Sequence, residues 1–122
     1  NKSGKVLNIA SIGGLRGNRP DTKMYTISYN ASKAAMINFT RELAAEWGQY
    51  NINVNALAPG FFPSKMSQEL IEQQSEIILP SIPLQRFGGD QDLQGPAVFM
   101  VSEAARHITG QCLAVDGGAT AV

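Results

Sequence analysis

Three short apolar runs, separated by long segments with helical signals, constrain the fold of this chain most strongly. They span residues 5–10, 51–58 and 111–115, and each is followed by a turn that contains glycine. Runs of this length between turn residues are typical of buried strands. Because helical segments stand between them, we expect the strands to run parallel and to be joined by right-handed crossovers. The pattern predicts an α/β fold, part of a doubly wound sheet with about three parallel strands and flanking helices.

The first long helical segment has recognisable start and stop signals. Thr26 or Ser28 is expected to cap its first turn, and Gly48 is expected to end it in the left-handed conformation. Apolar residues recur at three- and four-residue steps along this segment, namely at Met36, Phe39, Leu43 and Trp47. Such spacing predicts a stripe that lies in the core or in an interface.

Two more helices are expected in the second half of the chain. An amphipathic helix over residues 64–78 is expected to form either a lid over a pocket or a packing face, and Pro80 and Pro83 end it. Asp90 is the expected N-cap of a further helix, which carries apolar residues over 93–101.

Composition narrows the classes of partner. The chain has 122 residues, which suits one domain, and its 10 basic and 10 acidic residues give a net charge of 0. Without a basic run, we expect no nucleic acid and no membrane surface as partner, and no apolar run approaches the ~20 residues of a membrane span. Cys112 and His107 are each the single residue of their type, so no disulfide framework and no metal site are expected. A reducing, cytoplasmic setting and a small-molecule partner fit these features.

A tyrosine and a lysine stand four residues apart near the start of the first helical segment. On a helix, Tyr29 and Lys33 project from one face, where the ammonium favours the phenolate form of the tyrosine. This pairing suits a group that gives and retakes a proton. The same spacing also fits an ordinary solvated helix face. Tyr25 has a tyrosine rather than a lysine four residues on, so we do not assign it the acid role.

Ser11 follows directly after the first predicted strand. Ligands of open parallel sheets bind at the carboxyl ends of the strands, so its hydroxyl is a candidate for substrate binding. The alternative is a serine that only caps the turn. The polar residues 15–23 are expected to form a surface loop, whose Arg16 and Arg19 either reach for a charged substrate group or stay solvated.

Several short motifs, taken together and in order, resemble the C-terminal half of the short-chain dehydrogenase/reductase family, with some likeness to reductases of the 3-oxoacyl type. They lie at residues 8–11, 29–35, 53–60, 83–88, 108–110 and 115–118. The resemblance covers nearly the whole chain and implies a Rossmann-like fold. It also implies that Tyr29 is the general acid/base, that Lys33 assists it and binds the cofactor ribose, and that Ser11 holds the substrate oxygen.

The same resemblance implies a nicotinamide cofactor, NADP or NAD, with NADP favoured by the 3-oxoacyl likeness. Tyr29 and Lys33 would contact it, and the residues that shape the nicotinamide pocket would be Pro59, Gly60, Phe62 and Ser64. In the family, residues like those at 60–83 line the substrate pocket, and here they suggest an apolar substrate. The spacing from Ser11 to Tyr29, 29 − 11 = 18 positions, is longer than is usual in the family and indicates an insertion in the loop between them.

The N-terminal half of the family fold, with its glycine-rich turn for the cofactor pyrophosphate, has no counterpart in this sequence. We therefore expect residues 1–122 to be the C-terminal catalytic half of an NAD(P)-dependent oxidoreductase, whose activity in isolation stays open. The alternative is a non-catalytic fragment that acts as an oligomerising interaction module. The resemblance implies a homo-oligomer, a dimer or tetramer, and a bare edge strand would strengthen that tendency.

Overall fold

The computed structural model describes residues 3–65 and 67–122, and within them a single parallel sheet forms the centre. Its strands are β1 (Gly4–Ile9), β2 (Ile52–Pro59) and β3 (Cys112–Val115), in the order β1-β2-β3. In the parallel register, Gly4 lies beside Ile52 and Ile9 beside Leu57, while Ala56 lies beside Cys112. The predicted parallel α/β sheet is confirmed.

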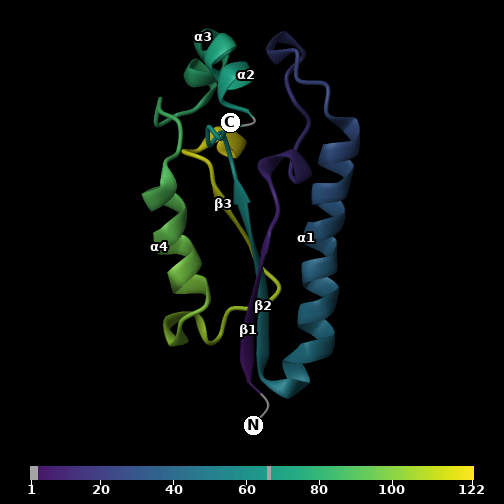
Figure 1. Cartoon of the computed structure of the whole chain (residues 1–122). Coiled ribbons are helices and arrows are strands. Elements are labelled where there is room, and N and C mark those ends of the chain that lie inside the picture. The colour runs from purple at the N-terminus through teal and green to yellow at the C-terminus, as the bar shows by residue number, and fades with distance from the viewer. Residues whose placement is uncertain (1–2, 66) are drawn as a thin grey trace.

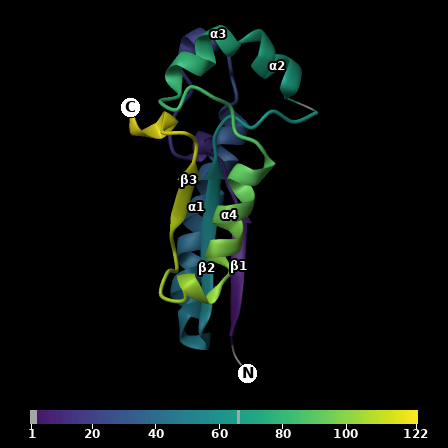
Figure 2. The same cartoon turned by 90° about the vertical axis from the view of Figure 1, so that its left-hand side faces the viewer.

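Helices cover both faces of this sheet. Figure 1 shows α1 (Ile27–Trp47) on one face and α4 (Asp90–Met100) on the other, and the turned view of Figure 2 agrees. The short helices α2 (Gln68–Gln73) and α3 (Ser75–Ile78) lie beyond the carboxyl ends of the strands (Figure 2). The arrangement is doubly wound, as the sequence pattern predicts. No helix in the described residues combines the length and the apolar character that crossing a bilayer requires.

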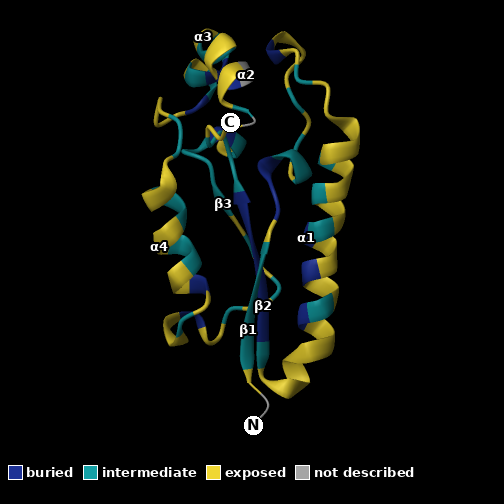
Figure 3. Cartoon of the chain, in the orientation of Figure 1, coloured by how far each residue is buried: buried dark blue, intermediate teal, exposed yellow. Residues whose placement is uncertain are grey.

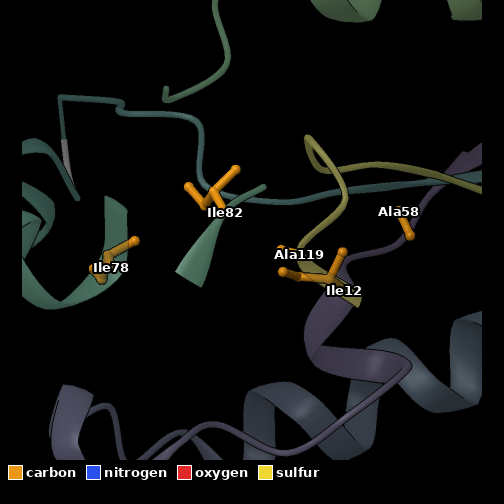
Figure 4. Packing of buried hydrophobic residues seen from close by; sticks show 5 residues of the cluster. All are labelled: Ile12, Ala58, Ile78, Ile82 and Ala119. Carbon is orange, nitrogen blue, oxygen red and sulfur yellow. The ribbon is translucent and has the colours of Figure 1, made fainter. Parts of the chain in front are cut away.

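The core follows the central strand. Every residue of β2 from Asn53 to Ala58 is buried, because neighbouring strands flank it and helices cover both its faces (Figure 3). One buried cluster lies near the carboxyl ends of the strands and joins residues from distant segments, namely Ile12, Ala58, Ile78, Ile82 and Ala119 (Figure 4). This cluster ties the turns around the strand ends to the segment that contains α3.

The start and end of α1 differ from the sequence prediction. Thr26 occupies the N-cap position, but its side chain makes no capping hydrogen bond. Gly48 has a right-handed conformation, with φ of −57°, and the chain continues into a 3₁₀ turn. The left-handed residue is Asn51, with φ of 58°. Because asparagine tolerates this conformation, the chain turns toward β2 three residues later than predicted.

The stripe predicted for α1 is only in part its packing face. The buried residues of the helix are Ile37, Thr40 and Ala44, and Phe39 is 54% exposed. Each buried residue directly follows a residue of the predicted stripe (Met36, Phe39 and Leu43), so the packing face is rotated by about one position from the predicted face. The predicted helix over 64–78 is instead a turn followed by α2 and α3, and residue 66 lies outside the described residues. Gly89, not Asp90, is the N-cap of α4, where its backbone N–H donates to the Asp92 carboxylate.

Candidate active site

A cavity of about 520 Å³ opens at the carboxyl edge of the sheet, where β1 and β2 end. All the residues that the sequence analysis assigned to catalysis or cofactor binding line this one cavity: Ser11, Tyr29, Lys33, Pro59, Gly60, Phe62 and Ser64. They come from segments that are far apart in the chain. Their common position is where open parallel sheets bind ligands.

Ser11 stands where the chain leaves β1 and enters a 3₁₀ turn, Ile12–Gly14. It is only 9% exposed, and its Oγ accepts a hydrogen bond of 3.0 Å from the backbone N–H of Gly13. The capping role considered for this serine is therefore real. Its hydroxyl proton is not used in that bond, so the same side chain can still donate to a ligand in the cavity.

Tyr29 and Lys33 lie one turn apart on α1. The Lys33 ammonium is 5.5 Å from the centre of the Tyr29 ring, and Nζ donates a hydrogen bond of 3.2 Å to the carbonyl oxygen of Ile9 at the end of β1. This bond ties the helix to the end of β1, two residues before Ser11. Among the described residues, the Tyr29 hydroxyl has no hydrogen-bond partner, and Tyr29 is 50% exposed. The hydroxyl is therefore free to hydrogen-bond with a ligand.

Two glycines let the 3₁₀ turn after β1 come close to α1. A Cβ on Gly14 would lie 2.6 Å from the backbone carbon of Lys33, and one on Gly13 would lie 2.6 Å from Oδ1 of Asn30. A side chain at position 14 would push the backbone of α1 away from the strand end, whereas one at position 13 would displace the Asn30 side chain. The glycines thus set the position of Ser11 relative to the residues of α1.

The floor of the cavity is formed where β2 ends. Gly60 donates its backbone N–H to the carbonyl of Val115, and a Cβ on it would lie 2.8 Å from Cβ of Asp116. The ring of Phe62 packs directly on Gly88. Farther along, the hydroxyls of Ser64 and Ser67 lie 2.9 Å apart, and both line the cavity.

The sequence analysis missed the polar wall of this cavity. Asn18, Thr26 and Asn30 line it, together with Met24. The arginines of the same loop do not. Arg16 donates to the carbonyl of Ala119 at 2.7 Å, and Arg19 pairs with Asp21. A loop of polar residues shows no periodicity, so no signal in the sequence separates side chains that face the cavity from those that face away.

The clearest pKa shifts belong to groups outside the cavity lining. The Arg86 guanidinium donates two hydrogen bonds to Asp92, at 2.8 and 2.9 Å, and with the Gly89 N–H it holds the pKa of Asp92 well below its ordinary range. Burial raises the pKa of the Cys112 thiol. Arg86, Asp92 and Cys112 are not among the residues that line the cavity.

The cavity offers free hydrogen-bond donors but no phosphate cradle. An ammonium has three N–H donors, and within the described residues that of Lys33 uses one, so two are free for a ligand. The glycine turn after β1 is no phosphate cradle, because the N–H groups of Gly13 and Gly14 already donate to Ser11. The described residues also contain no group of three His, Cys, Asp or Glu side chains that could hold a metal ion.

Comparison with known proteins shows which family model and which relatives the chain is similar to. A family model described as enoyl-(acyl carrier protein) reductase matches residues 1–120. The chain is 47% identical over 117 residues to a 2-dehydro-3-deoxy-D-gluconate 5-dehydrogenase of Dickeya dadantii, covering 94% of this chain and 44% of the relative. It is 41% identical over 118 residues to a 3-oxoacyl-(acyl-carrier-protein) reductase of Rickettsia felis, covering 97% of this chain and 47% of that protein.

The fold agrees with these relatives. A crystal structure of a putative NAD(P)-dependent gluconate 5-dehydrogenase from Beutenbergia cavernae, with bound NADP at low occupancy, has a TM-score of 0.91 and 39% identity, over 99% of this chain and 47% of that one. The chain spans about half the length of the curated relatives it matches. On the match of the family model and these relatives, the chain belongs to the short-chain dehydrogenase/reductase family.

Proposed function

We propose that residues 1–122 are the catalytic half of an NAD(P)-dependent oxidoreductase that interconverts a carbonyl and an alcohol on a small molecule. The observation that carries this proposal is the convergence of Ser11, Tyr29 and Lys33 on one cavity at the carboxyl edge of the sheet. The relatives support it, since they are dehydrogenases and reductases. They favour it over the non-catalytic interaction module.

In the proposed mechanism, the Tyr29 hydroxyl donates its proton to the carbonyl oxygen as the carbonyl carbon is reduced, and the product is the alcohol. The negative charge left on the phenolate is stabilised by the Lys33 ammonium, and the phenol regains its proton from solvent. Ser11 donates a hydrogen bond to the same substrate oxygen, where charge develops. In the oxidation direction, the same groups act in reverse.

A bound nicotinamide cofactor supplies or takes the hydride. Lys33 would hold its ribose hydroxyls, and the residues proposed to shape its pocket are Pro59, Gly60, Phe62 and Ser64. NADP is favoured over NAD, because the Beutenbergia cavernae structure contains NADP. The pyrophosphate site and the adenosine site would come from residues outside this chain segment or from a second chain, in line with the share of the relatives that the chain spans.

Self-association is the second part of the proposal. In the described residues, β1 pairs only with β2 and therefore has a free edge, and α1 has an exposed outer face that includes Phe39 and Trp47 (Figure 3). A dimer or tetramer would cover such surfaces. We also propose a cytoplasmic location, for which the single cysteine of the sequence is the support.

The test is titration of the chain with NADPH and NADH by calorimetry, together with assays of carbonyl reduction. A hybrid protein that joins the N-terminal half of the Dickeya dadantii relative to residues 1–122 is assayed in parallel. We expect turnover by the hybrid and weak cofactor binding by the chain alone. Tyr29→Phe should lower kcat by at least about 100-fold in the hybrid, since it removes the general acid.

Tyr25→Phe is the matched control. This tyrosine is 79% exposed and does not line the cavity, so its hydroxyl should not matter to turnover. Equal loss of activity in both variants, or full activity in Tyr29→Phe, would contradict the role proposed for Tyr29. A correctly folded hybrid without any carbonyl reductase activity would contradict the proposed function itself.

A further inference from the structure

The loop before α1 contributes a polar wall to the candidate active site. Asn18 and Thr26 line the cavity from this loop, and Asn30 lines it from the first turn of the helix. The segment that follows Gly60 contributes Phe61, Phe62 and Ile71, together with Ser64 and Ser67, whose hydroxyls bond to each other. A ligand in the cavity therefore meets both hydrogen-bonding groups and apolar surface.

Thr26 stands at the N-cap of α1 but uses its hydroxyl for side-chain hydrogen bonds in the polar wall instead of capping the helix. A threonine at an N-cap normally accepts a hydrogen bond from a backbone N–H of the first helical turn. Here its hydroxyl accepts from Nδ2 of Asn18 at 2.8 Å and donates to Oδ1 of Asn30 at 3.0 Å. Asn18 Nδ2 also donates to the carbonyl of Met24 at 3.0 Å, which fixes the loop. The three side chains thus form a hydrogen-bonded row that runs from Asn18 through Thr26 to Asn30.

The Asn30 end of this hydrogen-bonded row lies beside the proposed catalytic groups. Asn30 follows Tyr29 in the sequence, and its side-chain amide packs on Gly13. A Cβ placed on Gly13 would lie 2.6 Å from Asn30 Oδ1 and 3.5 Å from Ser11 Oγ. The polar wall thus continues up to the serine that is proposed to hold the substrate oxygen.

At each end of the hydrogen-bonded row, the asparagine side chain retains an unused hydrogen-bonding group. Within the described residues, Asn18 Oδ1 has no donor and Asn30 Nδ2 has no acceptor. A free acceptor and a free donor on one wall complement hydroxyl groups, because each hydroxyl can both donate and accept. An alkyl chain in the same position would leave both amide groups desolvated without a partner, which is unfavourable.

We propose that Asn18, Thr26 and Asn30 select a small carbonyl substrate that carries hydroxyl groups beside the reacting carbonyl, with Asn18 as the specificity-determining residue. This inference rests on the proposed oxidoreductase function of the same cavity. It refines the expectation of an apolar substrate, which took account of only the wall that follows Gly60.

The test uses two ketones, 1,3-dihydroxypropan-2-one and pentan-3-one. The second has a methyl group in place of each hydroxyl group of the first. Their kcat/KM values are measured with the hybrid protein, and their binding to the chain alone is compared by saturation-transfer NMR, which requires no cofactor. We expect the unmodified protein to prefer the dihydroxy ketone. Asn18→Leu should lower the kcat/KM ratio of the dihydroxy ketone to pentan-3-one about tenfold, mainly through KM.

A variant pair separates recognition from folding. Thr26→Val removes the central hydroxyl and should lower the same preference, whereas Thr26→Ser keeps the hydroxyl and should restore it. A general folding defect would instead reduce the use of both ketones together.

The outcomes distinguish this inference from the function on which it rests. If both ketones are reduced and Asn18→Leu leaves their ratio unchanged, the inference is wrong and the function stands. A second outcome is that neither ketone is reduced, but the dihydroxy ketone binds in preference and Asn18→Leu abolishes that preference. In that case the proposed recognition of hydroxyl groups stands, and the proposed oxidoreductase function is wrong. Preferential binding of pentan-3-one would overturn the inference outright.

Discussion

At the scale of single residues, Asp116 shows how a carboxylate outside the cavity supports the floor of the site. One carboxylate oxygen accepts from the N–H of Gly118, and the other accepts from the N–H and the hydroxyl of Thr120, at 2.9 and 2.7 Å. Burial raises the pKa of Asp116, but these hydrogen bonds and the charge of Arg16 together lower it by more, so the net shift is downward. The backbone of Gly60 rests against this residue.

We predict that Thr120→Val raises the pKa of Asp116 toward its ordinary value of 3.8. Because the folded pKa is depressed, Asp116 stabilises the fold above its unfolded pKa, and this contribution is lost as the pH falls through the folded pKa. The variant should lose about 1 kcal/mol at neutral pH and show a weaker acid dependence of unfolding. Carboxyl NMR titration and chemical denaturation measure both effects. Thr120→Ser, which keeps the hydroxyl, should behave like the unmodified chain.

At the scale of elements, the position of α1 against the end of β1 depends on close backbone approach. Gly14 lies where a Cβ would come within 2.6 to 2.8 Å of three backbone atoms of Lys33 and Ala34. Backbone atoms within a helix cannot move aside as a flexible side chain can. Lys33, in the same turn of α1, donates to the carbonyl of Ile9, so the position of the helix against β1 also sets the position of Lys33.

We predict that Gly14→Ala destabilises the chain by about 1–3 kcal/mol, because the added methyl group overpacks this contact. It should also lower carbonyl reductase activity of the hybrid protein, since it moves Lys33 relative to Ser11. Gly17→Ala is the control: no atom lies within 4 Å of its Cβ position, and its φ is not positive. Thermal unfolding and turnover of both variants test the prediction, and an equal response of the two would contradict it.

At the scale of the whole molecule, the described residues form a sheet with a free edge and helices with uncovered apolar side chains. β1 is an edge strand, and apolar side chains are exposed on both helical layers, for example Phe39 at 54% on α1 and Val98 at 66% on α4. Unpaired strand edges and apolar patches favour association with further chain.

We predict that the 13.1 kDa chain self-associates at micromolar concentration and elutes from size exclusion as a dimer or a larger species. Phe39→Glu should shift the equilibrium toward the monomer, because it places a charge on the exposed face of α1. Asn38→Glu, at the neighbouring exposed position, adds the same charge without removing apolar surface and is the control. A clean monomer for the unmodified chain would contradict the prediction.

The amino-acid sequence by itself determined the parallel sheet and the flanking helices, because apolar runs, glycine turns and helical steps are read from neighbouring residues. A joint site of Ser11, Tyr29 and Lys33 was implied by the resemblance to the short-chain dehydrogenase/reductase family, and the three residues line one cavity. Only the tertiary structure decided which face of α1 packs, that Arg16 bonds to Ala119 across 103 positions, and that Thr26 faces the cavity. The physical reason is that polar loop residues follow no periodicity, and their hydrogen-bond partners are chosen by the space that the folded chain leaves.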